Sequence, residues 1–473
     1  MEHVKIDTDQ KALDINLDEK IYGTFAEIGA GQEVARIFFK VGAAAGTIAK
    51  TMSAYDKTFS DKIYGEEPSG RYVCESRLYK MLDHEYNLMV ERLRESRPQS
   101  KFFVFADTVA AINYQKTVKG QGWLGLRFQT EPDSEPNDFV LHCKMLDNDQ
   151  QLQQSAIGVL GVNMLYACYH YHDNPDLFIS SLLDSLQGRI QVDMVRVSGP
   201  DFQHLDNRYA SLLLVKHKLT EVSMFDPSGA SIHGSEFLYK KSLMVVRGNY
   251  RPPTLVSVDV IKSSFEQFKN ELDVVAEKAH VMAELTLSNL KVNGELDEKD
   301  FLDRADLLCA LGQTVIISDC NNHQALINYL SDFKIKKLGL VIGVRELLEI
   351  INNKYYKNQD GRLLVAFGEL FSRNIKIYAY PAIQQNSKEL LTAKTLPVPD
   401  GIRFLHRYLL ENQHIVEVEN YNEDLLHIFP QSVLKLIQEG DETWERMVPS
   451  KLVVLIKEKE MFDYPNSKIE FEV

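Results

Sequence analysis

The chain has 473 residues and a formal net charge of −14, from 53 Lys and Arg against 67 Asp and Glu. This acidic balance argues against general binding to nucleic acid or to an anionic membrane, because both need clustered basic side chains. The length predicts two or three domains. The cysteines are few and scattered, and the sequence shows neither an apolar leader nor an apolar run of about 18 residues. We therefore expect a soluble cytoplasmic protein with reduced cysteines and no membrane span.

The first hundred residues divide into two stretches. Residues 1–20 are polar and acidic, which predicts a mobile tail or a strand that docks a partner. Residues 21–100 carry apolar side chains at the three- and four-residue spacing of amphipathic helices, most regularly from Ser76 to Ser96. We expect residues 21–100 to form a helical segment. Its apolar content exceeds what short helices bury alone, which predicts a homo-oligomer held partly by these helices.

Residues 101–275 combine apolar, strand-like runs with helical patterns and are expected to form a first α/β portion. Residues 156–171 are apolar almost all round, which predicts a buried helix, and residues 209–219 predict a second one. The predicted strands are 101–111, 122–129, 138–147, 191–200, 223–226 and 242–250.

Residues 276–473 are expected to form a second α/β portion with mainly parallel strands. Strand-like runs at 281–289, 314–320, 337–344 and 375–381 alternate with helical patterns. Such alternation predicts parallel βαβ units. A doubly wound sheet and an irregular barrel both fit, and both place ligand chemistry beyond the carboxyl ends of the strands. The division between the two portions is expected somewhere in residues 270–295.

Two short motifs resemble parts of known sites but lack the remaining residues. Gly29 and Gly31 precede a predicted helix, but a dinucleotide-binding loop would have a third glycine where Val34 stands. His170 and His172 would lie on opposite sides of a helix, with no cysteine pair at zinc-ligand spacing nearby. We interpret the glycines as packing positions and expect no structural zinc.

Three carboxylates are the candidate catalytic or metal-binding groups. Asp107 ends an apolar run, and Asp193 and Glu284 interrupt otherwise apolar strands. A buried carboxylate is costly unless it meets a cation, a metal or several hydrogen-bond donors. Each of the three therefore has two interpretations, as a structural ion pair beneath the loops or as part of a polar site.

The candidate anion-binding groups are basic side chains, above all in the segment VVRGNYRPP. Arg247 and Arg251 flank a glycine there, and two guanidinium groups near one turn can grip a carboxylate or a phosphate. The other candidates are Lys240, Lys241, Arg196 and Arg208. One common cavity is predicted to be approached by Arg247, Arg251, Asp107, Asp193 and Glu284.

The chain carries, in order, the segments FADTVAA, GWLGLRFQ, HCKMLD, VDMVRVSGP, DNR, LYKK, VRGNYRPPT and AFGELF. With them it resembles, from about Ile21 nearly to its end, a family of cytosolic bacterial proteins. Members of that family often carry the name nicotinate- or nicotinamide-nucleotide adenylyltransferase, or TonB-dependent receptor. The resemblance itself implies no mechanism.

Neither name is supported by the motifs in this chain. An adenylyltransferase needs a loop of the H-x-G-H type, and the nearest segment, Ile232-His233-Gly234, lacks the second histidine. An outer-membrane receptor needs a signal peptide and many alternating strands, which the sequence does not show.

The sequence is therefore compatible with two functions of different classes. The first is an enzyme that acts on a phosphorylated or nucleotide-like small molecule with Mg²⁺. In it the basic side chains hold the anion, while the three carboxylates bind the metal or act as acid and base. The second is a non-catalytic cytosolic protein that assembles with itself through the helices of residues 21–100.

Overall fold

The computed structural model describes residues 5–292, 294–320, 322–358, 362–371, 375–384 and 389–465. The chain divides into two compact units, Met1–Ser223 and Met224–Val473. Each unit combines helices with a sheet, which confirms the predicted α/β class, and neither sheet closes into a barrel. Among the described residues, no helix is both long and apolar enough to cross a membrane.

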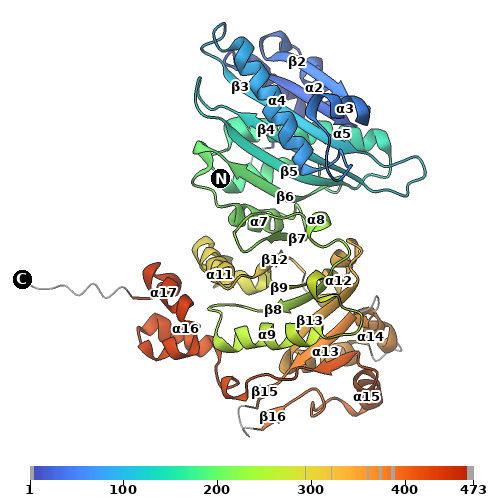
Figure 1. The fold of residues 1–473 in the computed structure, drawn as a ribbon, viewed down its shortest axis with the longest axis vertical. Coiled ribbons are helices and arrows are strands. Elements are labelled where there is room, and N and C mark those ends of the chain that lie inside the picture. Colours follow the sequence, from blue (N-terminus) through green and yellow to red (C-terminus); the bar gives the residue numbers. More distant parts are fainter. Residues whose placement is uncertain are drawn as a thin grey trace, which may run out of the picture. The chain divides into compact units, whose positions relative to one another are not determined.

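A six-stranded mixed sheet forms the centre of the first unit (Figure 1). Its strand order is β2-β1-β3-β4-β5-β6, with β1 parallel to β2 and β3, and with antiparallel pairing from β3 to β6. The parallel strands put their carboxyl ends at one edge of this sheet. The strands are β1 (Ile21–Gly29), β2 (Ile48–Ala54), β3 (Lys101–Ala110), β4 (Gly120–Phe128), β5 (Asn137–Met145) and β6 (Ile190–Ser198).

Helices cover both faces of this first sheet. Along β3, Phe103 and Phe105 point into a core shared with α1, α2 and α5, whereas Val104 and Ala106 point into a second core shared with α4. The prediction that α5 is buried almost all round is confirmed. The helices are α1 (Thr8–Leu17), α2 (Glu33–Val41), α3 (Lys57–Tyr64), α4 (Glu75–Leu93), α5 (Gln150–His170), α6 (Pro175–Ser180) and α7 (Asn207–Lys216).

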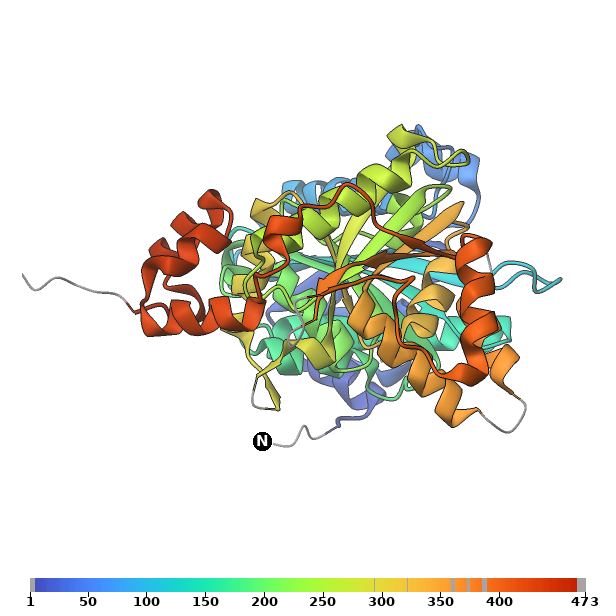
Figure 2. The ribbon, with the colours of Figure 1, turned by 90° about the horizontal axis from the view of Figure 1, so that it is seen from below.

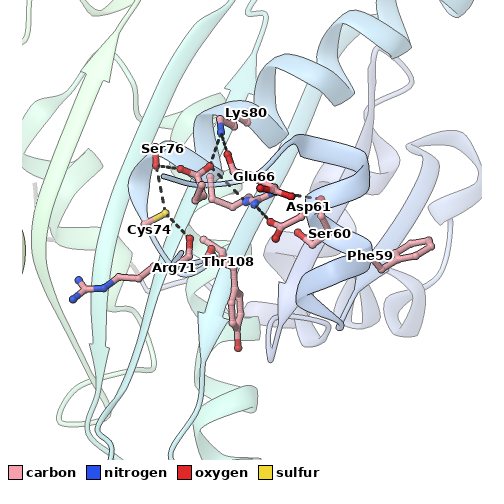
Figure 3. Close-up of polar contacts among 12 residues, drawn as sticks. Phe59, Ser60, Asp61, Glu66, Arg71, Cys74, Ser76, Lys80 and Thr108 are labelled. Atoms are coloured by element: carbon pink, nitrogen blue, oxygen red, sulfur yellow. Dashed lines mark hydrogen bonds and ion pairs between the residues drawn. The ribbon is translucent and has the colours of Figure 1, made fainter. Parts of the chain in front are cut away.

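A buried ion-pair network ties α3 and the loop after it to α4 (Figure 3). Arg77 of α4 is fully buried, and its guanidinium group pairs with Asp61 of α3. In the loop, Glu67 accepts a hydrogen bond from Ser76 at 2.6 Å and pairs with Lys80 at 2.9 Å. The guanidinium group also donates to the carbonyl oxygen of Ser60 at 3.2 Å, and its Nε lies 3.7 Å from the Glu67 carboxylate. Since a buried charge needs partners of the opposite sign, these contacts hold both α3 and the loop against α4.

The second unit is built on a seven-stranded sheet of order β17-β14-β13-β8-β9-β12-β7 (Figure 1). All the neighbouring pairs from β17 to β12 are parallel. The chain runs from β8 through β9 to β12, then returns to the other side of β8 with β13, β14 and β17. Of the two alternatives left open by the sequence, the structure therefore shows the doubly wound sheet.

The strands of this sheet are β7 (Val222–Phe225), β8 (Ser242–Arg247), β9 (Ala279–Thr286), β12 (Thr314–Ser318), β13 (Lys337–Gly343), β14 (Ile375–Tyr380) and β17 (Ile415–Glu417). Two short antiparallel ladders lie outside it. They are β10 (Lys291–Val292) with β11 (Glu295–Leu296), and β15 (Ala382–Ile383) with β16 (Leu390–Leu391).

Helices lie on both faces of the parallel sheet, α9 on one and α13 and α14 on the other (Figure 2). Near the C-terminus, α16 and α17 enclose a small core around the fully buried Trp444. The helices are α8 (Gly234–Phe237), α9 (Leu255–Lys269), α10 (Leu287–Leu290), α11 (Glu298–Ala310), α12 (His323–Ser331), α13 (Val344–Lys357), α14 (Leu363–Phe371), α15 (Arg403–Glu411), α16 (Pro430–Glu439) and α17 (Ser450–Glu458).

The organisation differs from the prediction at the N-terminus. Residues 8–17 form α1, whose Ala12 and Ile15 are buried, so most of the predicted tail is a packed helix. Residues 21–100 contain three helices, as predicted, but also β1 and β2. Strand β1 lacks a recognisable strand pattern in the sequence, because Gly23 and Glu27 interrupt its apolar residues.

The boundary between the units also differs from the prediction. It falls between Ser223 and Met224, whereas the predicted portions were 101–275 and 276–473. The predicted boundary lies just before β9, inside the second sheet, because β8 pairs in parallel with both β9 and β13. The strand at 242–250, which fitted either portion, therefore belongs to the second unit.

Candidate functional site

A buried ion pair stands at the carboxyl edge of the second sheet. Arg247 and Glu284 are register partners on β8 and β9. Nε and Nη2 of Arg247 donate to the two Glu284 carboxylate oxygens at 2.8 and 2.9 Å, and the Ser318 hydroxyl donates to the same carboxylate at 2.6 Å. Glu284 is fully buried, so this bidentate pairing supplies the charge balance that its burial requires.

The remaining guanidinium nitrogen of Arg247 is not used by this pair. Within the described residues, Nη1 of Arg247 has no hydrogen-bond partner. Arg247 also lines a cavity of about 530 Å³, which lies over the ends of the parallel strands. The other lining residues are Asn322, His323, Gln324, Glu346, Glu349, Ile350, Asn353, Lys354, Lys357, Asn358 and Glu369.

The place of this cavity in the fold follows from the strand order. Arg247 ends β8, and Glu346 lies in the first turn of α13, directly after β13. Strands β8 and β13 are neighbours whose connections leave in opposite directions. Ligands of doubly wound sheets bind at this reversal point, outside the carboxyl ends of the strands.

His323 is the most buried polar side chain of the cavity lining. It opens α12 just after β12, where the Asn322 side chain caps the helix by accepting the Ala325 N–H at 2.9 Å. The side chain of His323 is 7 % exposed, and burial, helped by the charge of Arg247, lowers its pKa to about 3. The imidazole is therefore neutral at pH 7, and its Nε2 has no hydrogen-bond partner among the described residues.

Helix α13 supplies a polar stripe along the cavity. Its Val344, Leu347 and Ile351 are buried, while the side chains that line the cavity recur at three- and four-residue spacing. Burial raises the pKa of Glu346, and the neighbouring carboxylates act in the same direction while Arg247 opposes them. At the far end, Lys354 donates to the carbonyl oxygen of Ala366 at 2.6 Å. The cavity therefore offers both acceptors and cations to a ligand.

The remaining basic candidates of the second unit lie elsewhere. Arg251 pairs with Asp300, which also pairs with the buried Arg304. Lys240 and Lys241 precede β8, so the whole strand separates them from Arg247 at its other end. The ammonium groups of these lysines lie over the rings of Tyr239 and Phe237 at 5.0 and 4.2 Å. Of the five residues predicted to share one cavity, only Arg247 lines this one.

In the first unit, Asp107 forms part of a buried acid pair. It is fully buried on β3, and its register partner on the parallel strand β1 is Glu27, which is 3 % exposed. Neither carboxylate oxygen of Asp107 has a hydrogen-bond partner in the described part of the chain. A Cβ added to Gly31 would lie 2.0 Å from Oδ1 of Asp107, so the turn before α2 closes directly over the acid. This close approach agrees with the interpretation of Gly31 as a packing position.

Burial governs the protonation of this acid pair. It raises the pKa of Glu27 to about 7 and the pKa of Asp107 well above its ordinary value, and each shift is increased by a neighbouring carboxylate. One backbone N–H, from Ala35 in α2, reaches Glu27 at 3.3 Å. Both shifts have the same direction, so folding favours the protonated form of the pair.

The other candidates of the first unit are engaged in pairs. Asp193 accepts from His142 at 2.6 Å and from Lys144 at 3.2 Å. Arg196 pairs with Glu75, and Arg208 pairs with Asp206 at 2.6 Å. For Asp193 this fits the structural ion pair that the sequence left open, and the two arginines, predicted to bind an anion, each pair with a carboxylate of the chain itself.

We also compared the arrangement of the His, Cys, Asp and Glu side chains with the needs of a metal site. Taken unit by unit, the described residues bring no three ligand atoms of His, Cys, Asp or Glu within 4.8 Å of one another. A Mg²⁺ site formed by Asp107, Asp193 and Glu284 would need residues of both units, because Glu284 belongs to the second. A Mg²⁺ cofactor thus stays a prediction.

Sequence reasoning identified Arg247 and Glu284 but missed His323, Glu346, Glu349 and Glu27. His323 had one usable signal, since it opens a helix immediately after a buried strand. Glu346 and Glu349 begin a polar stripe at helical spacing after the next strand. Glu27 had none, because β1 itself was not predicted.

The geometry defines an α/β protein of two units, the second of them doubly wound with a cavity at its strand reversal. No protein-family model matches the chain, and no curated protein matches it either. Among solved structures, the chain is similar to the competence/damage inducible protein CihA from Agrobacterium tumefaciens, with 18 % identity, 35 % of this chain and 98 % of that one covered, and a TM-score of 0.26.

Two further bacterial structures give similar values. A competence or damage-inducible protein from Enterobacter asburiae shares 13 % identity over 34 % of this chain and 96 % of that one, with a TM-score of 0.26. The competence damage-inducible protein A of Klebsiella pneumoniae shares 12 % identity over 35 % of this chain and 99 % of that one, with a TM-score of 0.27. These partial likenesses establish neither the fold nor the function of this chain.

Proposed function

We propose that the second unit binds a small molecule through a phosphate or carboxylate group in the cavity beside Arg247. The observation that carries this proposal is the geometry of Arg247. Two of its nitrogens are held by Glu284, which fixes the plane of the guanidinium group. The third has no hydrogen-bond partner among the described residues, and the Arg247 side chain is part of the cavity lining. A guanidinium group fixed in this way loses little further freedom when it binds an anion.

Two features of the surroundings support this function. The cavity, at about 530 Å³, falls in the range of small-molecule and nucleotide sites. The first turn of α12 also lines it, and free N–H groups at a helix N-terminus favour an anion. A phosphorylated or nucleotide-like ligand fits these features, and Mg²⁺-assisted phosphoryl or nucleotidyl chemistry is the reaction that we would test after binding.

The test needs a variant that removes the cation without leaving Glu284 buried and unpaired. We would compare E284Q, which keeps Arg247, with the double variant R247M/E284Q. Each full-length protein would be titrated calorimetrically with sugar phosphates, nucleotides and dicarboxylates, with and without Mg²⁺. E284Q keeps only one acceptor for Arg247 and should lose some affinity, and the double variant, which removes the cation as well, should bind about ten- to a hundred-fold more weakly than E284Q. No binding by the unchanged protein, or equal binding by the double variant, would refute the proposal.

A second candidate function is self-assembly, as the N-terminal helices suggested. Exposed large apolar side chains favour it: Phe39, Tyr55 and Phe59 are 53, 76 and 60 % exposed. Deleting residues 1–60 would remove β1 and β2 from the sheet, so the double variant F39S/F59S is the better test. Light scattering should show the unchanged protein as an oligomer and the variant as a smaller species. A monomeric unchanged protein at all concentrations would remove this candidate.

A further inference from the structure

We infer that the ligand of this cavity carries an ammonium group as well as an anionic one, with Glu346 and Glu349 as the cation-binding residues. The ligand would then be a zwitterion of the amino-acid type. This inference rests on the proposed function and adds the second half of the ligand.

The two carboxylates lack a cation of their own. Glu346 and Glu349 stand one helical turn apart on α13 and both line the cavity. Within the described residues no Lys or Arg nitrogen lies within 4.0 Å of either, and the one ring nitrogen near Glu346 is Nε2 of the neutral His323, at 3.8 Å. Both side chains reach solvent, that of Glu346 with 43 % exposure, so water can donate to them in the free protein. An ionised carboxylate only accepts hydrogen bonds, so a ligand that displaces this water must bring donors in its place.

The charges around the cavity also favour a ligand that carries both signs. Facing the cavity or directly behind it are three cations, Arg247, Lys354 and Lys357, and four carboxylates, Glu284, Glu346, Glu349 and Glu369. A ligand that brought only negative charge would add to an excess that is already negative. A ligand with both signs satisfies Arg247 at one end and the two carboxylates of α13 at the other.

His323 gives an independent reason to expect a ligand between these poles. It is a buried imidazole whose Nε2 is unpartnered in the described part of the chain, and it lines the cavity beside both Arg247 and Glu346. Leaving such a group unsatisfied is costly unless a ligand or water completes it. As a neutral ring it can hydrogen-bond a polar ligand atom without disturbing the charge balance.

An organic cation fits this place better than a metal ion. Mg²⁺ needs oxygen ligands at about 2.1 Å in a near-octahedral arrangement. In the described part of the second unit taken alone, no three candidate ligand atoms come within 4.8 Å of one another. An ammonium group has three N–H donors and can donate to two carboxylates without that close convergence.

Calorimetry with matched pairs of probes tests the inference on the full chain. The probes are the L-amino acids and O-phosphoserine, each beside its N-acetyl derivative, which keeps the anionic group and removes the ammonium charge. We expect at least one free amino acid to bind and its N-acetyl derivative to bind about ten-fold or more weakly. E349Q should lose a similar factor for the free amino acid only. The control E458Q changes an exposed glutamate on α17, away from the cavity, and should bind as the unchanged protein does.

The outcomes separate this inference from the proposed function. If N-acetyl probes or simple phosphate esters bind as well as the free amino acids, or if E349Q weakens both members of a pair equally, no ammonium subsite exists. A heat of binding for Mg²⁺ alone that E349Q abolishes would assign the carboxylates to a metal instead. If R247M/E284Q loses affinity while E349Q does not, the anion site stands and the zwitterion is refuted.

Discussion

The buried acid pair of the first unit predicts an unusual dependence of stability on pH. The change to make is E27Q, which removes the ionisable group but keeps an oxygen for the Ala35 N–H. The pKa of Glu27 is raised from 4.5 to about 7 by burial, so the folded unit holds a proton that the unfolded chain has already lost. Between these two pH values the folded state binds more protons, and stability therefore falls as pH rises.

The size of the effect follows from the shift. A rise from 4.5 to about 7 corresponds to about 3 kcal/mol at 1.36 kcal/mol per pH unit. Below pH 4.5 both states are protonated and the contribution of Glu27 to stability is complete. Above about pH 7 it has been lost. E27Q should match the unchanged protein near pH 4.5 and exceed its stability by about 3 kcal/mol at pH 8.

The two tryptophans make the measurement specific to one unit. Trp123 lies in the first unit and Trp444 in the second, so unfolding of a W444F background followed by fluorescence reports on the first unit. Guanidinium titrations at several pH values would give the stability difference between E27Q and its background. The exposed Glu95 provides the control variant E95Q, which should show no such trend. A difference that does not change with pH, or that favours the glutamate at pH 8, would refute the reasoning.

Two further predictions concern packing in the first unit. R77M should lower the free energy of unfolding by about 3 kcal/mol in the Trp123 assay, because it leaves buried carboxylates short of a cation, whereas R36M at an exposed position should change it by less than about 0.5 kcal/mol. G31A should also destabilise the unit, since its Cβ would lie 2.0 Å from a carboxylate oxygen of Asp107, while G46A meets nothing within 4 Å. Equal effects within either pair of variants would contradict the packing described.

The parts of the fold that could be predicted are those whose burial is uniform. Strands β12, β13 and β14 are covered on both faces, so each reads as a short continuous apolar run between helical patterns. Strand β2 lies at the edge of its sheet, where every second residue is exposed, and its sequence IAKTMSA contains few strong strand formers. Strand β1 is buried but contains Gly23 and Glu27, which mask its pattern.

The candidate site could also be predicted only in part from the sequence. A charged residue within an apolar strand is visible in the sequence, and Arg247 and Glu284 could be identified for that reason. Their pairing depends on the register between β8 and β9, which no local pattern reveals. The contribution of His323 and Glu346 depends on strand order, because it arises where the chain returns from β12 to the far side of β8.

The central position of β8 has a consequence for the synthesis of the chain. Its neighbour β13 begins at Lys337, 95 residues after β8 begins at Ser242. At ribosomal rates of about 5–20 residues per second, one long edge of β8 waits roughly 5–20 s for its partner. That edge belongs to the apolar segment SLMVV, a sequence suited to wrong pairing with another chain. The nascent protein therefore leaves this edge open to aggregation while residues 248–336 emerge, and a chaperone that binds extended apolar segments would protect it in that interval.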